Sequence, residues 1–191
     1  NGNSPFTVRV MDMVTDLVTK ELKMKLNIDD GEIKADVNRD IITVAAIDRT
    51  HVPGKLFAGL IKGFNLKSGA FACSAAWDTS DIIVVGTNDA DMAVAVNRIH
   101  DLQGGAVICQ AGKILHELPM PVFGIISDQP IEVIARQLKE LNKTVSSLGV
   151  RFSDPLLSLF TLTAAAIPYL RICEEGLVNL KDGKTVDLFV G

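Results

Sequence analysis

The chain has 191 residues, of which 48% are hydrophobic and 5% aromatic, and its formal net charge is -4. This composition allows one substantial, mainly aliphatic core. Basic and acidic residues are interspersed, which excludes the basic stripe that phosphate backbones require, so we expect no nucleic-acid partner. No apolar run approaches the roughly 20 residues that cross a bilayer, and no secretory signal is visible. We therefore expect no membrane partner and a cytoplasmic location.

The cysteines and the first residue bear on cellular context. Cys73, Cys109 and Cys173 are odd in number and widely spaced, which favours reduced thiols over a disulfide framework or a zinc site. The chain begins at Asn1 rather than at a methionine. From this we expect a fragment or a processed product.

The N-terminal part carries β-strand patterns. Residues 6–10 alternate as an edge-like strand, and residues 22–26 alternate Leu and Met with Lys, which predicts a strand with one wet face. Turns are predicted at residues 29–31 and 36–40, where Asp, Asn and Gly gather. We interpret residues 1–38 as an N-terminal β-strand segment, left from a small β-domain, and residues 39–191 as an α/β domain.

Two buried strands end in polar residues. Residues 41–47 predict a buried strand that runs into Asp48-Arg49-Thr50-His51. The apolar, small-residue runs 56–64 and 69–76 predict two strands, with a helix as the alternative for the first, and the second run ends in Trp77-Asp78-Thr79-Ser80.

Polar strand ends are where α/β proteins tend to place function. If the two ends converge, Arg49, His51, Trp77 and Asp78 form one substrate cleft. In the structural alternatives, Arg49 pairs with a carboxylate such as Asp48, Trp77 is a core or interface residue, and Asp78 caps a turn.

The centre of the predicted fold is a strand-turn-helix unit. Residues 82–85 form a continuous β-branched run, typical of a strand buried on both faces. After Gly86, Thr87 to Asp89 offer cap oxygens, and Met92, Val96 and Ile99 repeat at helical spacing. The turn is either a plain connection, which its single glycine favours, or an anion site on exposed N–H groups.

The C-terminal half continues the mixed pattern. Residues 106–109 and 113–118 predict a hairpin, residues 119–121 an extended crossover, and residues 127–130 the cap of a helix over 131–148. The apolar segment 156–167 is expected to be buried, either in the core or against a partner. Residues 170–173 and 178–190 predict terminal strands and a hairpin. The fold class is therefore α/β in the mixed α+β sense, a mixed β-sheet layered with helices plus N-terminal strands.

The three histidines provide no metal site. His51, His100 and His116 lack the short spacing to one another, or to a cysteine, that a metal on one helix or hairpin needs. We expect solvated or hydrogen-bonded roles for His100 and His116. No nucleophile elbow, phosphate loop or dinucleotide fingerprint is present.

Several long segments together resemble one family. They are Gly59-Leu-Ile-Lys-Gly-Phe-Asn-Leu-Lys-Ser-Gly-Ala70, then residues 81–98, Leu118-Pro-Met-Pro121 and Gly124-Ile-Ile-Ser-Asp128. From about Val8 onward the chain is similar to the C-terminal domain of bacterial and archaeal adenine deaminases, amidohydrolases of purine metabolism. The resemblance implies a parent enzyme that converts adenine and water to hypoxanthine and ammonia. It also implies an N-terminal (β/α)₈ barrel in the same polypeptide, with a divalent metal (manganese, iron or zinc) held by His and Asp.

The chain departs from the family pattern at both polar strand ends. The family's Arg-His is Arg49-Thr50 here, and its His-Asp-Ser-His-Asn is Trp77-Asp78-Thr79-Ser80-Asp81. Arg49 and Asp78 are retained, whereas Thr50, Trp77 and Ser80 replace imidazoles that supply hydrogen bonds or proton transfer. The departures indicate a divergent member with a changed substrate or lost activity.

Three expectations follow. The chain is a C-terminal domain that helps complete the substrate site or the subunit interface of an adenine-deaminase-like enzyme. Alone it is inactive and binds no metal. It forms a homo-oligomer, with residues 156–167 or 59–76 at the contact. The alternative is a stand-alone, non-catalytic binding or oligomerisation module.

Overall fold

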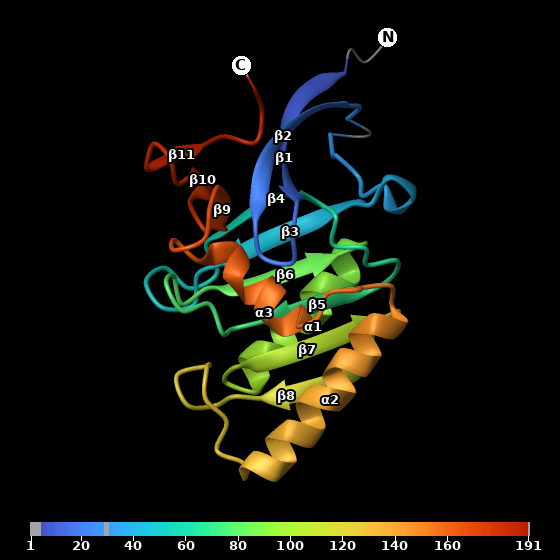
Figure 1. Cartoon of the computed structure of the whole chain (residues 1–191), viewed down its shortest axis with the longest axis vertical. Helices are drawn as coiled ribbons and strands as arrows, with labels where there is room; N and C mark the ends of the chain where they lie inside the picture. Colours follow the sequence, from blue (N-terminus) through green and yellow to red (C-terminus); the bar gives the residue numbers. More distant parts are fainter. Residues whose placement is uncertain (1–4, 29–30, 191) are drawn as a thin grey trace.

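The computed structural model describes residues 5–28 and 31–190, and its largest element is an eight-stranded sheet (Figure 1). The strands lie in the order β2-β1-β4-β3-β6-β5-β7-β8, from the N-terminal hairpin at the top of Figure 1 to β8 at the bottom. The strands are β1 Phe6–Met13, β2 Thr19–Leu26, β3 Ile41–Ile47, β4 Leu56–Lys62, β5 Ala70–Cys73, β6 Ile82–Gly86, β7 Gly105–Gln110 and β8 Lys113–Pro119. The β1–β4 pair is parallel and the other pairs are antiparallel.

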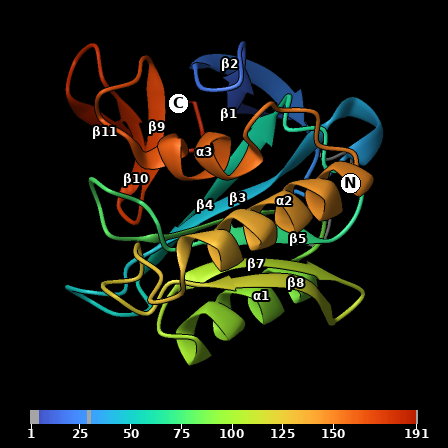
Figure 2. The same cartoon turned by 60° about the horizontal axis from the view of Figure 1, so that its bottom comes forward.

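Helices cover both faces of this sheet, so the predicted layered α/β architecture is confirmed (Figure 2). Helix α1, Asp89–Asp101, packs on one face, while α2, Ile131–Ser147, and α3, Pro155–Phe160, pack on the other. In β6, Ile82 and Val84 face α1, whereas Ile83 and Val85 face α2 and α3. The β-branched run is therefore buried on both faces, as predicted, and Asn88 caps α1 through its side chain.

A three-stranded sheet lies beside α3. It consists of β9 Leu170–Cys173, β10 Gly176–Asn179 and β11 Lys184–Val186, and it confirms the predicted terminal hairpin. Arg171 of β9 is 1% exposed and donates to the backbone carbonyls of Leu17, Thr161, Ile167 and Pro168. Four carbonyl dipoles thus replace the water that a buried guanidinium loses.

The N-terminal strands belong to the main sheet. β1 pairs with both β2 and β4, so the prediction of an edge-like strand at residues 6–10 was wrong; the lysine-bearing β2 is the edge strand. Beyond its pairs with β4, β1 is bonded by the C-terminal segment: Arg9 N donates to Leu188 O at 2.8 Å and Val190 N donates to Thr7 O at 2.9 Å. The division at residue 38 stays a prediction.

The structure decides between strand and helix for residues 56–64 and tests the predicted turns and hairpin. Residues 36–40 form a turn around the 3₁₀ helix η1, Val37–Arg39, whereas residues 29 and 30 of the other predicted turn lie outside the described residues. The run 56–64 forms β4, which excludes the helical alternative. The predicted hairpin is β7–β8, with a bulge near Ile108.

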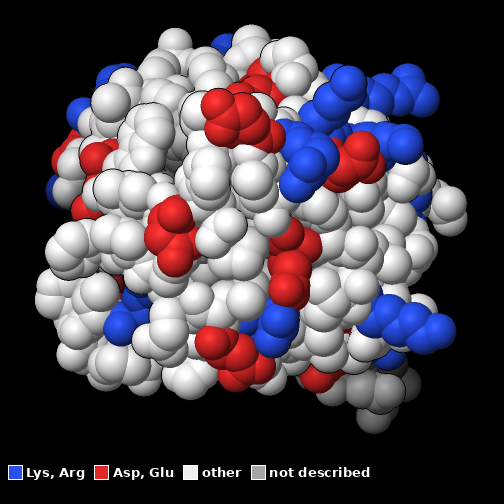
Figure 3. All heavy atoms as spheres, turned by 90° about the horizontal axis from the view of Figure 1, so that it is seen from below, with Lys and Arg blue, Asp and Glu red and all other residues white. Residues whose placement is uncertain are grey.

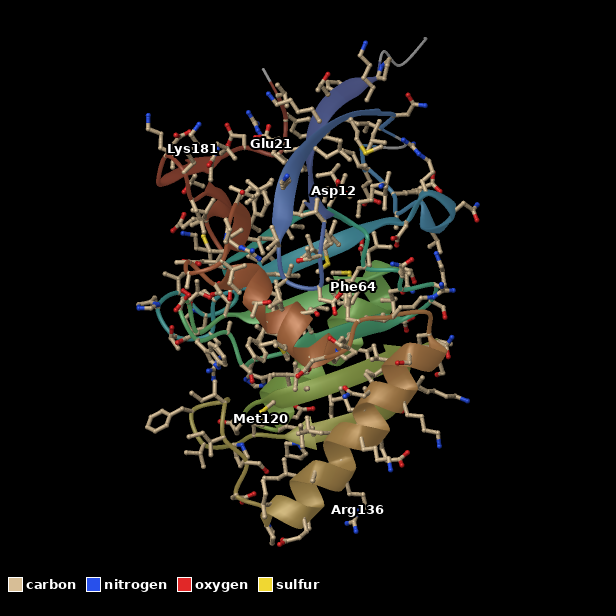
Figure 4. All side chains as sticks on the ribbon, viewed as in Figure 1. Asp12, Glu21, Phe64, Met120, Arg136 and Lys181 are labelled. Carbon is tan, nitrogen blue, oxygen red and sulfur yellow. The ribbon has the colours of Figure 1, made fainter. Side chains whose placement is uncertain are left out.

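Helix α2 is buried along only part of its apolar stripe. Leu141 and Val145 are buried, but Ile131 is 70% exposed because the N-terminal half of α2 extends beyond β8, the edge strand (Figure 1). Ser127 and Asp128 do not cap the helix; Pro130 occupies the cap position without a side-chain hydrogen bond, so the predicted cap was wrong. Arg136 projects into solvent from this half (Figure 4).

The apolar segment 156–167 lies mostly in the core. Leu159 and Leu162, from α3 and the following 3₁₀ turn η2 (Thr161–Thr163), are fully buried within the chain. They join the cluster that contains Phe64, whose ring contacts Phe152 edge to face at 5.1 Å (Figure 4). The large apolar side chains of segments 156–167 and 59–76 are buried or half-buried against the chain's own sheet and helices, so the structure does not support these segments as contact surfaces; the homo-oligomer itself stays a prediction.

Candidate functional site

The site begins at one edge of the main sheet. Because Ile47 pairs with Ile82, Cys73 with Ile83, and Pro119 with Gly105, strands β3, β5 and β8 all end at this edge. The loops that follow them, residues 48–54, 74–81 and 120–126, lie on the left side of the molecule in Figures 1 and 2. We call these three loops the Arg49 rim.

Arg49 joins two of these loops. Its Nε donates to the Ser80 carbonyl at 2.7 Å and its Nη2 donates to the Phe123 carbonyl at 2.5 Å. Burial lowers the pKa of Arg49, and the nearby Asp81 opposes this shift. Both guanidinium bonds go to backbone carbonyls, so the structure does not support the alternative in which Arg49 bonds to Asp48.

Asp48 organises the first loop and positions His51. Its carboxylate accepts the backbone N–H groups of Thr50, His51 and Val52 at 2.6–2.9 Å. These bonds hold the pKa of Asp48 well below its usual range. The His51 side chain is 81% exposed, with Nδ1 2.9 Å from the Thr50 hydroxyl and 3.8 Å from Asp48 Oδ1.

Trp77 and Asp78 connect the second loop to the α3 side of the sheet. The Trp77 ring centroid lies 4.6 Å from that of Phe160, yet 64% of Trp77 is exposed. Asp78 accepts the backbone N–H of Ala165 at 2.7 Å. The structure thus places all four predicted site residues at one sheet edge, but their hydrogen bonds go to other groups, and Arg49 and His51 are not hydrogen-bonded to Asp78.

Sequence reasoning missed the third loop of the rim. Phe123 has a positive φ of 54° and is 82% exposed, and Gly124 follows with a φ of 75°. The buried Ser74 hydroxyl donates to Gly124 O at 2.6 Å, and a Cβ at Gly124 would lie 2.4 Å from Arg49 Nη1. The available signal was that family-like segments flank Phe123 on both sides, at residues 118–121 and 124–128.

A second missed residue is Asp81, at the start of β6. It is 1% exposed, and neither carboxylate oxygen has a hydrogen-bond partner of normal geometry among the described residues. Burial raises the pKa of Asp81 to about 6; the nearby Thr79 hydroxyl and the Glu174 backbone N–H oppose the rise, and the charges of Glu174 and Asp48 add to it.

A cavity of about 450 Å³ opens beside Arg49. Asp48, Arg49 and Gly54 line one side, and Asn97 and His100 of α1 line the other. A larger cavity of about 620 Å³ lies between residues 31–35 and β4, and none of the predicted site residues lines it. We place the candidate site at the smaller cavity because Arg49 lines it together with an imidazole and an amide, polar groups that orient a small ligand; His51, Trp77 and Asp78 do not line it.

The opposite edge of the sheet is built differently. Here Asp91 is buried and accepts the Gly112 N–H at 2.7 Å, the Ala111 N–H at 3.2 Å and the Asn88 side-chain amide at 2.8 Å. Asp40 accepts the Asn65 N–H at 2.8 Å. We call residues 63–69, 86–91 and 110–112 the Asp91 rim; Asp91 joins two of its segments, and Thr87, Asn88 and Asp89 line part of the larger cavity.

Three features of the described residues bear on metals, nucleic acids and membranes. No group of three or more His, Cys, Asp or Glu side chains within residues 5–28 and 31–190 is arranged to hold a metal ion. Acidic and basic side chains are interspersed in the view from below (Figure 3). No helix in the described part is long and apolar enough to cross a membrane.

Comparison with known proteins identifies the family. The profile of the adenine deaminase C-terminal domain matches residues 16–184. An adenine deaminase of Kosmotoga olearia is 42% identical over 176 residues, which are 92% of this chain and 30% of that protein. Adenine deaminases of Moorella thermoacetica and Clostridium botulinum are 35% and 34% identical over 100% and 96% of the chain, and 32% and 31% of their own lengths are covered. The chain thus spans about a third of these relatives and belongs to the adenine deaminase C-terminal domain family.

Proposed function

We propose that this chain is the C-terminal domain of a metal-dependent adenine deaminase and that its Arg49 rim helps complete the substrate site. The reaction of the whole enzyme is hydrolysis of adenine to hypoxanthine and ammonia. The observation that carries the proposal is the guanidinium of Arg49, held by two backbone carbonyls beside a cavity. We assign the metal ligands to the part of the polypeptide outside this chain; residues 5–28 and 31–190 contain no group of three or more His, Cys, Asp or Glu side chains placed to hold a metal ion.

The part assigned to this chain is binding and orientation. A divalent metal bound in the barrel supplies hydroxide near neutral pH. Arg49 presents N–H donors and a positive charge, which suit the acceptor nitrogens of a purine ring. Because Thr50, Trp77 and Ser80 replace imidazoles, no proton-transfer role is assigned to these positions.

The test uses the full-length polypeptide that contains this chain. We expect it to release ammonia from adenine, and we expect Arg49→Met to lower kcat/KM at least about tenfold, the loss typical of one charged hydrogen bond. Arg39→Met is the matched control because Arg39 is exposed and remote from the rim. Turnover of another purine but not adenine would reject the substrate, and an unchanged kcat/KM would remove Arg49 from the site.

The 191-residue chain alone should neither deaminate adenine nor retain metal after dialysis against a chelator. One tightly bound manganese, iron or zinc ion per chain would contradict the proposal that the metal is held outside this chain.

A further inference from the structure

We propose that an apolar surface of the Arg49 rim is the face on which this domain docks against the catalytic part of its own polypeptide. The surface consists of Trp77, Val122, Phe123, Ile125 and Ile126, and we call it the apolar rim. All five are large hydrophobic side chains that remain exposed in the chain. The proposal rests on the proposed function, since the partner is the remainder of the deaminase.

The apolar rim is held rigidly in its exposed position. The turn that carries Phe123 and Gly124 is anchored from below by the Ser74 hydroxyl and from the side by Arg49. Arg49 also binds Ser80, three residues after Trp77, so one guanidinium fixes both parts of the surface. Met120, at the base of the turn, is buried in the core (Figure 4). A preformed aromatic anchor loses little entropy on binding, which is the behaviour of interface hot spots.

The positive φ of Phe123 supports the same conclusion. A bulky residue in the left-handed region is uncommon and strained, and in this turn it places an aromatic ring in water at 82% exposure. Neither the strain nor the exposure benefits the isolated chain. Both are offset if the ring is buried by a neighbouring domain.

The size of the surface favours a tethered domain over a second copy. With about 200 Å² for a fully exposed aromatic side chain, the five residues expose on the order of 500 Å². A free dimer typically buries about 800 Å² per partner, whereas domains joined in one chain dock through smaller areas. Tethering raises the effective concentration of the partner, so a modest apolar face is sufficient.

The relatives show that such a partner exists in the family. The Kosmotoga olearia protein matches this chain over only 30% of its length, so most of each relative lies outside the matched domain. A neighbouring domain of that size is available to cover the rim in every molecule.

Hydroxyl-radical footprinting of the full-length polypeptide tests the proposal, with Tyr169 as the internal reference. In this structure Trp77 and Phe123 are 64% and 82% exposed and Tyr169 is 49% exposed. After correction for intrinsic reactivity, we expect Trp77 and Phe123 to oxidise at least about fivefold more slowly than Tyr169. We further expect Phe123→Ser to raise oxidation of Ile126 at least about threefold, and Leu115→Ser, at an exposed position outside the rim, to leave it unchanged.

The docking proposal is overturned if Trp77 and Phe123 oxidise as fast as Tyr169, or if Phe123→Ser leaves Ile126 protected. It is also overturned if protection appears only as protein concentration rises, because that result assigns the face to a second copy. Adenine turnover is measured on the same samples. Protection without turnover rejects the proposed function and retains the docking surface, whereas turnover with an unprotected rim rejects the docking surface alone.

Discussion

The two rims of the main sheet differ in how they treat polar groups. At the Asp91 rim, the buried Asp91 carboxylate accepts two backbone N–H groups and a side-chain amide. At the Arg49 rim, Asp48 likewise accepts three backbone N–H groups, but the buried carboxylate of Asp81 has no hydrogen-bond partner of normal geometry among the described residues, and the Phe123 side chain faces water. The exposed apolar side chains are what single out the Arg49 rim as the edge that we propose a neighbouring domain covers.

The largest expected effect is a loss of stability at the Asp91 rim. Asp91→Ala leaves the N–H groups of Ala111 and Gly112 without an acceptor, and we expect a loss of about 3 kcal/mol in the free energy of unfolding. Urea denaturation measures it. Asp89→Ala, at an exposed first-turn position of the same helix, is the control and should lose only about 0.5 kcal/mol. Equal losses would show that the Asp91 contacts do not stabilise this rim.

The second effect concerns the hydrogen bonds by which Arg49 joins two loops of the Arg49 rim. Arg49→Met keeps the apolar stem but removes the bonds to Ser80 and Phe123, so we expect a loss of about 2 kcal/mol and faster amide exchange in residues 120–126. Exchange at residues 110–112 should stay unchanged. Faster exchange at both rims would mean that Arg49 supports the whole sheet and not one edge.

The third effect is a gain in stability, where the first two are losses. Asp81→Asn removes a buried charge that has no hydrogen bond of normal geometry among the described residues, so we expect a gain of about 1–2 kcal/mol at pH 8. Screening keeps this gain below the roughly 1.4 kcal/mol per pKa unit that linkage allows. The folded pKa of about 6 exceeds the usual 3.8, so the wild type loses stability as pH rises through this window. The gain should therefore vanish below pH ~4, build up to pH ~6 and stay constant above. Thermal unfolding across pH, with Asp89→Asn as a control, measures it.

The smallest effect tests whether His51 has any structural role. Its side chain is 81% exposed, and the loop is held by backbone bonds to Asp48, so His51→Ala should change stability by less than about 0.5 kcal/mol. A fall in kcat/KM of the full-length enzyme, without a change in unfolding, would then assign His51 to the substrate site. A loss of stability above 1 kcal/mol would contradict the purely exposed position.

Most of the fold was predictable because its signals are local. The β-branched run 82–85, the Asn88 cap and the Asp182-Gly183 turn each determine their own element. The edge position of β2 and the overhang of α2 were not predictable, since they depend on which strand lies at the end of the sheet. Helical periodicity predicts an apolar face but does not give the length of sheet beneath it.

The candidate site was predictable only in part. Two polar strand ends and the rule that function gathers there pointed to Arg49 and Trp77. Phe123 was missed because its exposure depends on a turn held by the distant Arg49 and Ser74. Asp81 was missed because a carboxylate before an apolar strand resembles an ordinary cap until its surroundings are known.

The seam between β1 and residues 188–190 bears on how the chain folds. Thr7 and Arg9 receive their hydrogen-bond partners from positions about 180 residues away, and the rings of Phe6 and Phe189 meet there at 5.9 Å. Loop closure over such a separation has a high entropic cost, so local hairpins such as β7–β8 form first and this seam forms late. Until it closes, part of β1 presents unpaired N–H and C=O groups, the kind of open edge on which partly folded chains aggregate.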